Sequence, residues 1–266
     1  MIGRLWRTWQ ARRDEAAIAR RAIPDDLWRR TLVRYPFLRR RDAADDEALR
    51  RLASLFLDRK EFHAAGGLRL DNAMAVAIAA QAVLPVLRLG LGRYDGFVGI
   101  VVHPDQVVAR REVADDDGLV HEYDEVLSGE AMSGGPLMLS WRDVRGAGRS
   151  AAQGYNVVIH EFAHVLDLAD GAADGVPLLP PGLARGEWLA VLEPEFERFC
   201  ERTERAEDTA LDPYGASSID EFFAVASEAF FVAPRAMRAE HAALYALFAR
   251  FFRQDPENET APQRGR

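Results

Sequence analysis

The chain has 266 residues and a mass of 29.7 kDa, and it is 48% hydrophobic and 9% aromatic, which excludes a globally disordered protein. Residues 1–60 carry 16 Lys and Arg against 9 Asp and Glu, a net charge of +7, whereas residues 61–266 carry 18 against 33, a net charge of −15. The acidic body argues against sequence-blind nucleic-acid binding, because phosphate contacts need basic surface. The single cysteine, Cys200, excludes an intramolecular disulfide and a cysteine-based zinc cage.

No segment of the chain has the character of a targeting or membrane sequence. The first residues never reach the apolar run of a secretory signal. The most apolar stretch, Ala73–Leu91, is interrupted by Gln81, Pro85 and Arg88 and is too short and too weakly apolar for a bilayer span. It predicts a buried core helix that ends near Pro85. We therefore expect a cytoplasmic protein without a membrane segment.

The composition along the chain suggests three parts. Residues 1–24, with Trp6 and Trp9 among arginines, are expected to form an N-terminal arm. Residues 25–253 are expected to form a single domain. Residues 254–266 are polar and rich in Pro and Gly, which is typical of a disordered tail.

Within the domain, helical patterns come first, then strands, then helices again. Apolar residues at three- and four-residue spacing predict helices over 25–60. Strands are predicted at 97–102, 107–113 and 137–141, and we interpret the last as an edge strand that could pair with an extended substrate. The small residues of 146–154 indicate a flexible connection. Further helices are predicted at 155–169, 186–204, 218–231 and 238–253. This grouping predicts an α+β fold, mainly helical, with a small sheet.

A five-residue motif in the helix predicted at 155–169 carries the chemistry: His160-Glu161-Phe162-Ala163-His164. Residues i and i+4 lie on one face of a helix, so both imidazoles can reach one Zn²⁺ at roughly 2.0–2.1 Å. Glu161 lies about 100° around the helix axis and can take a proton from an activated water without binding the metal. A polar surface stripe is the alternative, but apolar neighbours predict burial, which is costly for these side chains unless a metal or hydrogen bonds satisfy them.

A catalytic zinc site needs a third protein ligand and one open position. No histidine follows His164 at short range, so this ligand must come from a later element. Glu221 and Glu228 lie seven residues apart on one face of the helix predicted at 218–231, so one could bind zinc and the other could hold a ligand histidine. Alternatively, Glu221 could form a capping box with Ser218 at the start of the helix.

Two further residues have both a functional and an ordinary interpretation. Tyr214 could donate a hydrogen bond to the oxyanion of a tetrahedral intermediate, or it could be a loop tyrosine packed on its neighbours. Asp167 could orient an imidazole, or it could be a surface acid near the end of the helix.

Several segments together resemble the Mlc titration factor A family of zinc peptidases. The resemblance is carried by His160–Asp167, Asp117–His121, Leu127–Glu130, Gly135–Leu137, Leu139–Trp141, Glu221–Val225 and Phe230–Phe231. It implies a zincin-like, gluzincin-type metallopeptidase domain and a bacterial zinc peptidase, specifically an aminopeptidase. It also implies one zinc ion per chain bound by His160, His164 and Glu221, with Glu161 as general base and Tyr214 assisting the transition state.

The resemblance also implies a protein partner. Family members bind the glucose-responsive repressor Mlc and relieve repression of sugar-transport genes, so we expect a peptide substrate and an Mlc-type repressor, but neither nucleic acid nor membrane. The alternative function is a non-catalytic protein that sequesters a transcriptional repressor and has a structural or vestigial zinc site. A fourth protein ligand, for instance His121 or Glu228, would indicate that alternative.

Overall fold

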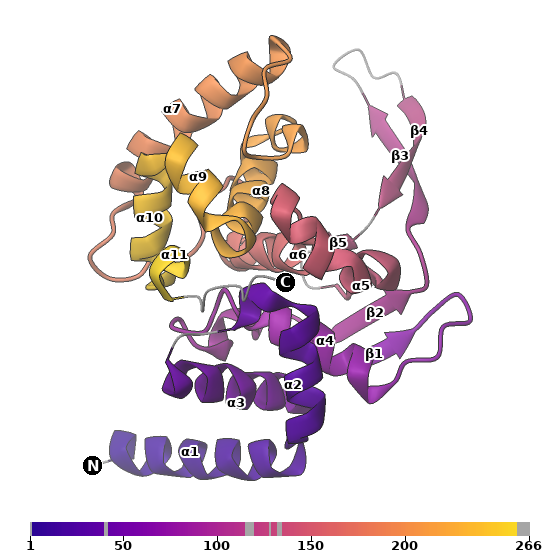
Figure 1. Ribbon diagram of the computed structural model, residues 1–266, viewed down its shortest axis with the longest axis vertical. Helices are drawn as coiled ribbons and strands as arrows, with labels where there is room; N and C mark the ends of the chain where they lie inside the picture. Colours follow the sequence, from indigo (N-terminus) through magenta and orange to yellow (C-terminus); the bar gives the residue numbers. More distant parts are fainter. Residues whose placement is uncertain (1, 40–41, 115–119, 128, 132–134, 260–266) are drawn as a thin grey trace.

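The computed structural model describes residues 2–39, 42–114, 120–127, 129–131 and 135–259, and for residues 2–8, 107–114, 120–127 and 130–131 it describes the backbone alone. Helices α1–α4 lie at one end of the molecule and α7–α11 at the other, with α6 between them (Figure 1). The prediction of a mainly helical α+β fold is confirmed. None of the helices in the described residues is long and apolar enough to cross a membrane.

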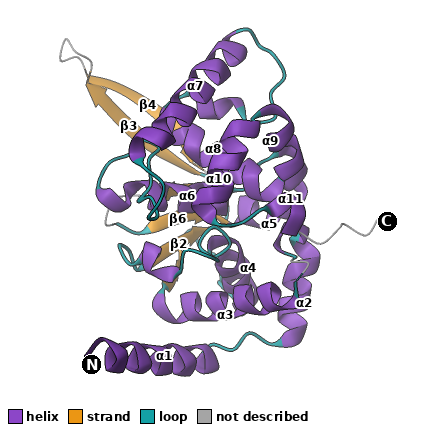
Figure 2. Ribbon diagram, turned by 90° about the vertical axis from the view of Figure 1, so that its left-hand side faces the viewer, coloured by secondary structure: helices purple, strands orange, loops and turns teal. Residues whose placement is uncertain are grey.

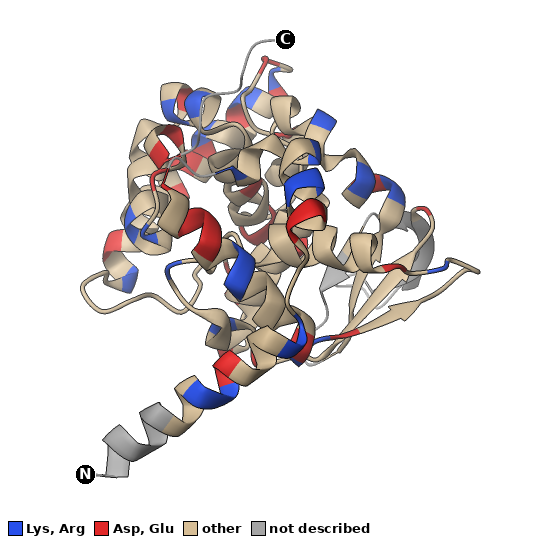
Figure 3. Cartoon of the chain, turned by 60° about the horizontal axis from the view of Figure 1, so that its bottom comes forward, with Lys and Arg blue, Asp and Glu red and all other residues tan. Residues whose placement is uncertain are grey.

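Four helices build the N-terminal end: α1 (Ile2–Arg20), α2 (Asp25–Arg34), α3 (Ala43–Arg59) and α4 (Asn72–Ala82). The predicted arm of residues 1–24 contains α1, which lies along α3 through ion pairs of Asp14 with Arg59 (2.9 Å) and Arg20 with Asp58 (3.1 Å). In the coloured part of α1, basic residues lie on both sides of a pair of acidic residues (Figure 3). Helix α4 is the expected core helix, and its buried alanines let neighbouring elements approach it closely.

The main sheet has the strand order β1-β2-β6-β5. β1 (Glu61–Ala64), β2 (Gly99–His103) and β6 (Leu137–Ser140) are parallel, and β5 (Gly129–Ala131) runs antiparallel to β6. The interpretation of 137–141 as an edge strand was wrong, because β6 is paired on both sides and β5 forms the edge. The remaining strands, β3 (Val107–Ala114) and β4 (Val120–Leu127), form a separate antiparallel hairpin that extends away from the body (Figures 1 and 2).

The flexible connection predicted at 146–154 is instead helical. Helix α5 (Trp141–Ser150) begins at Ser140, whose hydroxyl accepts from the Asp143 N–H at 3.3 Å, and a 3₁₀ turn follows it. A side chain at Gly148 would collide with the carbonyl oxygen of Arg34. The small residues of this segment therefore permit close packing of α5 on the end of α2 rather than flexibility.

The C-terminal half contains the remaining helices. They are α6 (Val157–Asp167), α7 (Arg185–Glu204), α8 (Ile219–Val232), α9 (Pro234–Glu240), α10 (Ala242–Phe252) and α11 (Pro256–Glu259). The single helix predicted at 238–253 is two, because the chain turns at His241. Of the predicted tail, residues 254–259 are described and end in α11, and residues 260–266 lie outside the described part. An aromatic core of Trp188, Phe223, Phe248 and Phe251 joins α7, α8 and α10.

Candidate metal centre

Helix α6 holds the histidine motif at the middle of the molecule (Figure 1). The buried Asn156 caps the helix, and its side-chain oxygen accepts from the Ile159 N–H at 3.0 Å. Phe162 faces the N-terminal core, where its ring centroid lies 4.8 Å from that of Tyr94 and 5.6 Å from that of Phe56. This packing fixes the rotation of α6 and turns the two histidines toward α8.

Helix α8 brings a carboxylate to both histidines. Glu221 Oε2 lies 3.1 Å from His160 Nε2 and 3.4 Å from His164 Nε2, and the two Nε2 atoms are 3.2 Å apart. The capping box considered for Glu221 does not form, because Ser218 makes no side-chain cap hydrogen bond. Among the described side chains, these three form the one cluster of His, Cys, Asp and Glu able to hold a metal ion.

The geometry of this triangle fits a tetrahedral cation. In a zinc site with bonds of roughly 2.0–2.1 Å, neighbouring ligand atoms lie roughly 3.3 Å apart, close to the three separations in the structure. Glu221 Oε2 is buried and accepts no hydrogen bond from the described residues, although such an oxygen normally has a partner. The donor set and the orphaned oxygen therefore both fit a bound metal ion.

The charge of the site also favours a cation. Glu161, Glu221 and Glu228 surround the two imidazoles in a largely buried space. Burial lowers the pKa of His160, but Glu228 and Glu221 outweigh it and raise that pKa well above its usual range. The pKa of Glu221 falls well below its usual range, because the two histidines outweigh the effect of burial. A site that attracts protons in this way also attracts a metal ion.

Glu161 lies beside the triangle without belonging to it. Its side chain is 5% exposed. Burial raises its pKa to about 7, and the neighbouring His160 and His164 limit the rise. A carboxyl group with a pKa near neutrality is suited to accept and release a proton during a reaction.

Glu228 contacts His160 from behind rather than joining the triangle. Its Oε1 lies 2.8 Å from His160 Nδ1, and its other oxygen accepts from the Asn156 N–H. The Asn156 amide also donates to Gln81 Oε1 at 2.9 Å. Spacing alone left the roles of Glu221 and Glu228 open, and the family resemblance gave Glu221 as the ligand. Neither pointed to Asn156 or Gln81.

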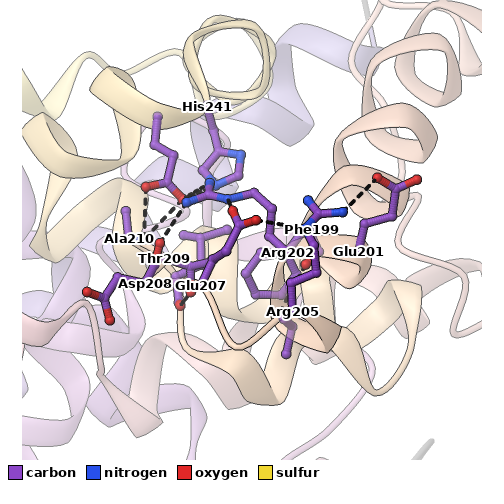
Figure 4. A network of polar contacts seen from close by, with 12 residues as sticks. Phe199, Glu201, Arg202, Arg205, Glu207, Asp208, Thr209, Ala210 and His241 are labelled. Carbon is purple, nitrogen blue, oxygen red and sulfur yellow. Dashed lines mark hydrogen bonds and ion pairs between the residues drawn. The ribbon is translucent and has the colours of Figure 1, made fainter.

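Tyr214 lies at the rim of the site, in the 3₁₀ turn Pro213–Ala216. Its side chain is 49% exposed, and its hydroxyl lies 3.4 Å from Glu221 Oε1, so it is not a tyrosine packed into its loop. A polar network fixes the preceding loop (Figure 4): Arg202 donates to the Asp208 carbonyl, and Glu240 accepts from the Ala210 N–H.

Asp167 has neither of the roles considered for it. It is fully buried, and its Oδ2 accepts from the Gly175 N–H at 3.0 Å. The Gly175 carbonyl in turn accepts from the Trp188 indole. Asp167 thus anchors the loop after α6 to α7.

Comparison with known proteins gives the family of this chain. Residues 6–253 match the family described as glucose-regulated metallo-peptidase M90. The chain is 40% identical over 217 residues to the Mlc titration factor A of Edwardsiella ictaluri, covering 80% of this chain and 82% of the relative. It is 36% identical over 235 residues to that of Salmonella arizonae, covering 87% and 92%. An uncharacterized protein of Synechocystis is 32% identical over 253 residues, covering 94% and 90%. The resemblance drawn from the motifs is confirmed, and the chain belongs to the glucose-regulated metallo-peptidase M90 family.

Proposed function

We propose that this chain is a zinc-dependent peptidase whose metal ion is held by His160, His164 and Glu221. The observation that carries the proposal is the triangle of two imidazole nitrogens and one carboxylate oxygen, with sides of 3.1–3.4 Å, beside the buried Glu161. Three protein ligands leave a fourth tetrahedral position open, which is the arrangement of catalytic rather than structural zinc sites.

In this proposal the reaction is hydrolysis of a peptide bond. When bound, the metal ion supplies Lewis-acid polarisation and lowers the pKa of a water molecule toward about 7. Glu161 takes a proton from the attacking water and later gives it to the leaving amine. Tyr214, whose hydroxyl is at the rim of the site, donates a hydrogen bond to the developing oxyanion.

The sheet edge suggests how an extended substrate binds. β5 is the last strand of the sheet and packs against α6. An unpaired strand edge offers backbone donors and acceptors to an extended peptide. This edge supports a peptide as the substrate, and it replaces 137–141 as the candidate docking strand. The narrower assignment as an aminopeptidase derives from the family resemblance, and peptides with free and acetylated N-termini would test it.

The test of the proposed function compares wild type with Glu161→Gln. Glutamine cannot accept the proton, so kcat should fall by about 10²–10⁴-fold, the usual contribution of a general base. Zinc content, measured by elemental analysis, should stay at one ion per chain because Glu161 is not a ligand. Removal of zinc with a chelator should abolish the wild-type activity, and added zinc should restore it. Full chelator-sensitive activity in Glu161→Gln would refute the role of Glu161.

A second candidate function is binding of an Mlc-type repressor. It is favoured by the name of the curated relatives, Mlc titration factor A. In the non-catalytic form of this idea, the zinc site is structural and has a fourth protein ligand. Glu228 contacts His160 Nδ1 instead, and the His121 side chain lies outside the described part of the chain. If wild type shows no peptidase activity, and both wild type and Glu161→Gln bind the repressor, the results would support the sequestering protein over the enzyme.

A further inference from the structure

The strand β5 crosses directly over the Glu161 side chain. A Cβ atom added at Gly129 would lie 2.5 Å from Glu161 Cγ and 2.6 Å from Cδ, and closer still to Oε1. Atoms cannot approach to such distances, so any side chain at position 129 must displace Glu161 or the strand. The contact joins the edge of the sheet to the residue beside the two histidines.

The close approach, rather than the backbone conformation, requires glycine here. Gly129 lies in a regular strand, paired with Leu139 of β6, and it is not among the glycines with positive φ. An alanine at this position would therefore have an acceptable backbone, and its cost would come from the collision alone. Gly129 therefore differs from glycines in turns, where a positive φ is the reason for glycine.

The strand also supplies a restraint on Glu161, for which the described residues provide no hydrogen bond. The described residues give the Glu161 carboxylate no hydrogen-bond donor, whereas Glu228 is held by both His160 and the Asn156 N–H. Glu161 is nonetheless buried, so packing must set its position. The short distances from a Cβ at Gly129 to Glu161 show that the backbone of β5 is one surface that packs directly against this side chain.

We propose that Gly129 is a positioning residue: by having no side chain, it lets the edge strand lie on Glu161 and hold the general base at the height of the histidine triangle. The inference rests on the proposed function for its effect on catalysis. The same short strand would then position both a peptide paired with β5 and the general base Glu161.

The contact itself can be tested without any activity, in a double-mutant cycle on the metal-free protein. Gly129→Ala should lower the urea midpoint of unfolding when position 161 is glutamate. In the Glu161→Ala background the same substitution should have little effect, because alanine lacks all three colliding atoms. The two effects should thus be strongly non-additive.

The positioning role is tested on the zinc-loaded enzyme. Gly129→Ala should reduce kcat by about 10²-fold, since a misplacement of roughly 1 Å can have that effect. Zinc affinity should be unchanged, because the substitution displaces the base and not the ligands. The matched control is Gly146→Ala in α5, where an added Cβ meets no atom within 4 Å and activity should equal that of wild type.

Two outcomes would overturn the inference. One is an equal loss of stability from Gly129→Ala in the wild-type and Glu161→Ala backgrounds, which would place the collision elsewhere. The other is a Gly129→Ala enzyme with at least half of the wild-type kcat, or one that loses kcat only in proportion to lost zinc. If instead Glu161→Gln is fully active, the proposed role of Glu161 as general base fails, and the stability cycle still decides whether the contact exists.

Discussion

Glu228 shows how a single buried residue can influence the proposed metal site without belonging to the triangle of His160, His164 and Glu221. Its carboxylate accepts from His160 Nδ1, which leaves Nε2 as the nitrogen that faces Glu221. Carboxylates in this position orient the imidazole and increase its basicity, and their loss typically weakens metal affinity by about 10–100-fold.

We therefore expect Glu228→Gln to bind zinc about 10–100-fold more weakly than wild type, measured by competition with a chromophoric chelator. The matched control is Glu195→Gln. Glu195 is also a buried carboxylate bound to a histidine, His241 Nδ1 at 2.8 Å, but it lies away from the triangle. Equal zinc affinities for the two variants would contradict the role given to Glu228.

Asp167 gives a pH dependence whose sign follows from its burial. Burial raises its pKa to about 6, so the folded protein holds this proton more tightly than the unfolded chain. The resulting stabilisation is complete below about pH 4 and is lost as the pH rises through about 6. Asp167→Asn keeps an oxygen for the Gly175 N–H and removes the titration.

Between about pH 4 and pH 6, the wild type should therefore lose stability relative to Asp167→Asn, measured as the difference in urea midpoint at each pH. A difference that does not change with pH would show that Asp167 does not titrate in this range.

Much of the site could be predicted at the scale of single residues, because the i, i+4 spacing of His160 and His164 is a local property of one helix. Spacing alone could not decide between Glu221 and Glu228, because both lie on one face of α8 and the position of α8 along α6 decides which one meets the Nε2 atoms. The family resemblance was what singled out Glu221. No sequence pattern indicated a role for Gly129, because its contact with Glu161 joins two elements that are separated in the chain.

At the scale of elements, Asn156 links the start of α6 to Gln81 on α4 and to Glu228 on α8. It caps the helix through the Ile159 N–H, its amide donates to Gln81, and its own N–H donates to Glu228. Caps of this kind contribute about 0.5–2 kcal/mol, and a buried acceptor left without its donor costs about 1–3 kcal/mol more.

Asn156→Ala should accordingly destabilise the protein by about 1.5–5 kcal/mol in urea unfolding. The control is Ser218→Ala, at the start of α8, because Ser218 occupies a cap position without a side-chain cap hydrogen bond. It should change stability by no more than about 0.5 kcal/mol. A similar loss in both variants would mean that the hydrogen bonds of Asn156 are not the source of its effect.

Element prediction failed where short-range patterns were weak. β1 and β5 have four and three residues, too few to show the alternation that identifies a strand. The glycines of α5 suggested a loop, yet the Ser140 cap and the close packing of Gly148 keep the segment helical. The long helices α7 and α8 were predicted to within about two residues because their apolar periodicity is sustained.

At the scale of the whole molecule, part of the basic charge of the N-terminal end lies in ion pairs between its helices. Basic residues of the N-terminal helices pair with nearby acids, as in Arg59 with Asp14 and Arg51 with Glu15. The metal centre lies between the two helical ends, where α6 and α8 meet and the sheet edge passes. The core on both sides of α6 holds the three proposed ligands in place before any metal binds.

The central claim is that one metal ion sits between His160, His164 and Glu221, and anomalous diffraction at the zinc edge from a zinc-loaded crystal tests it most directly. We expect one peak per chain, about 2.0–2.2 Å from His160 Nε2, His164 Nε2 and a Glu221 oxygen, with no fourth protein ligand. Absence of a peak at this position in zinc-saturated protein, or a peak closed by a fourth side chain, would contradict the account.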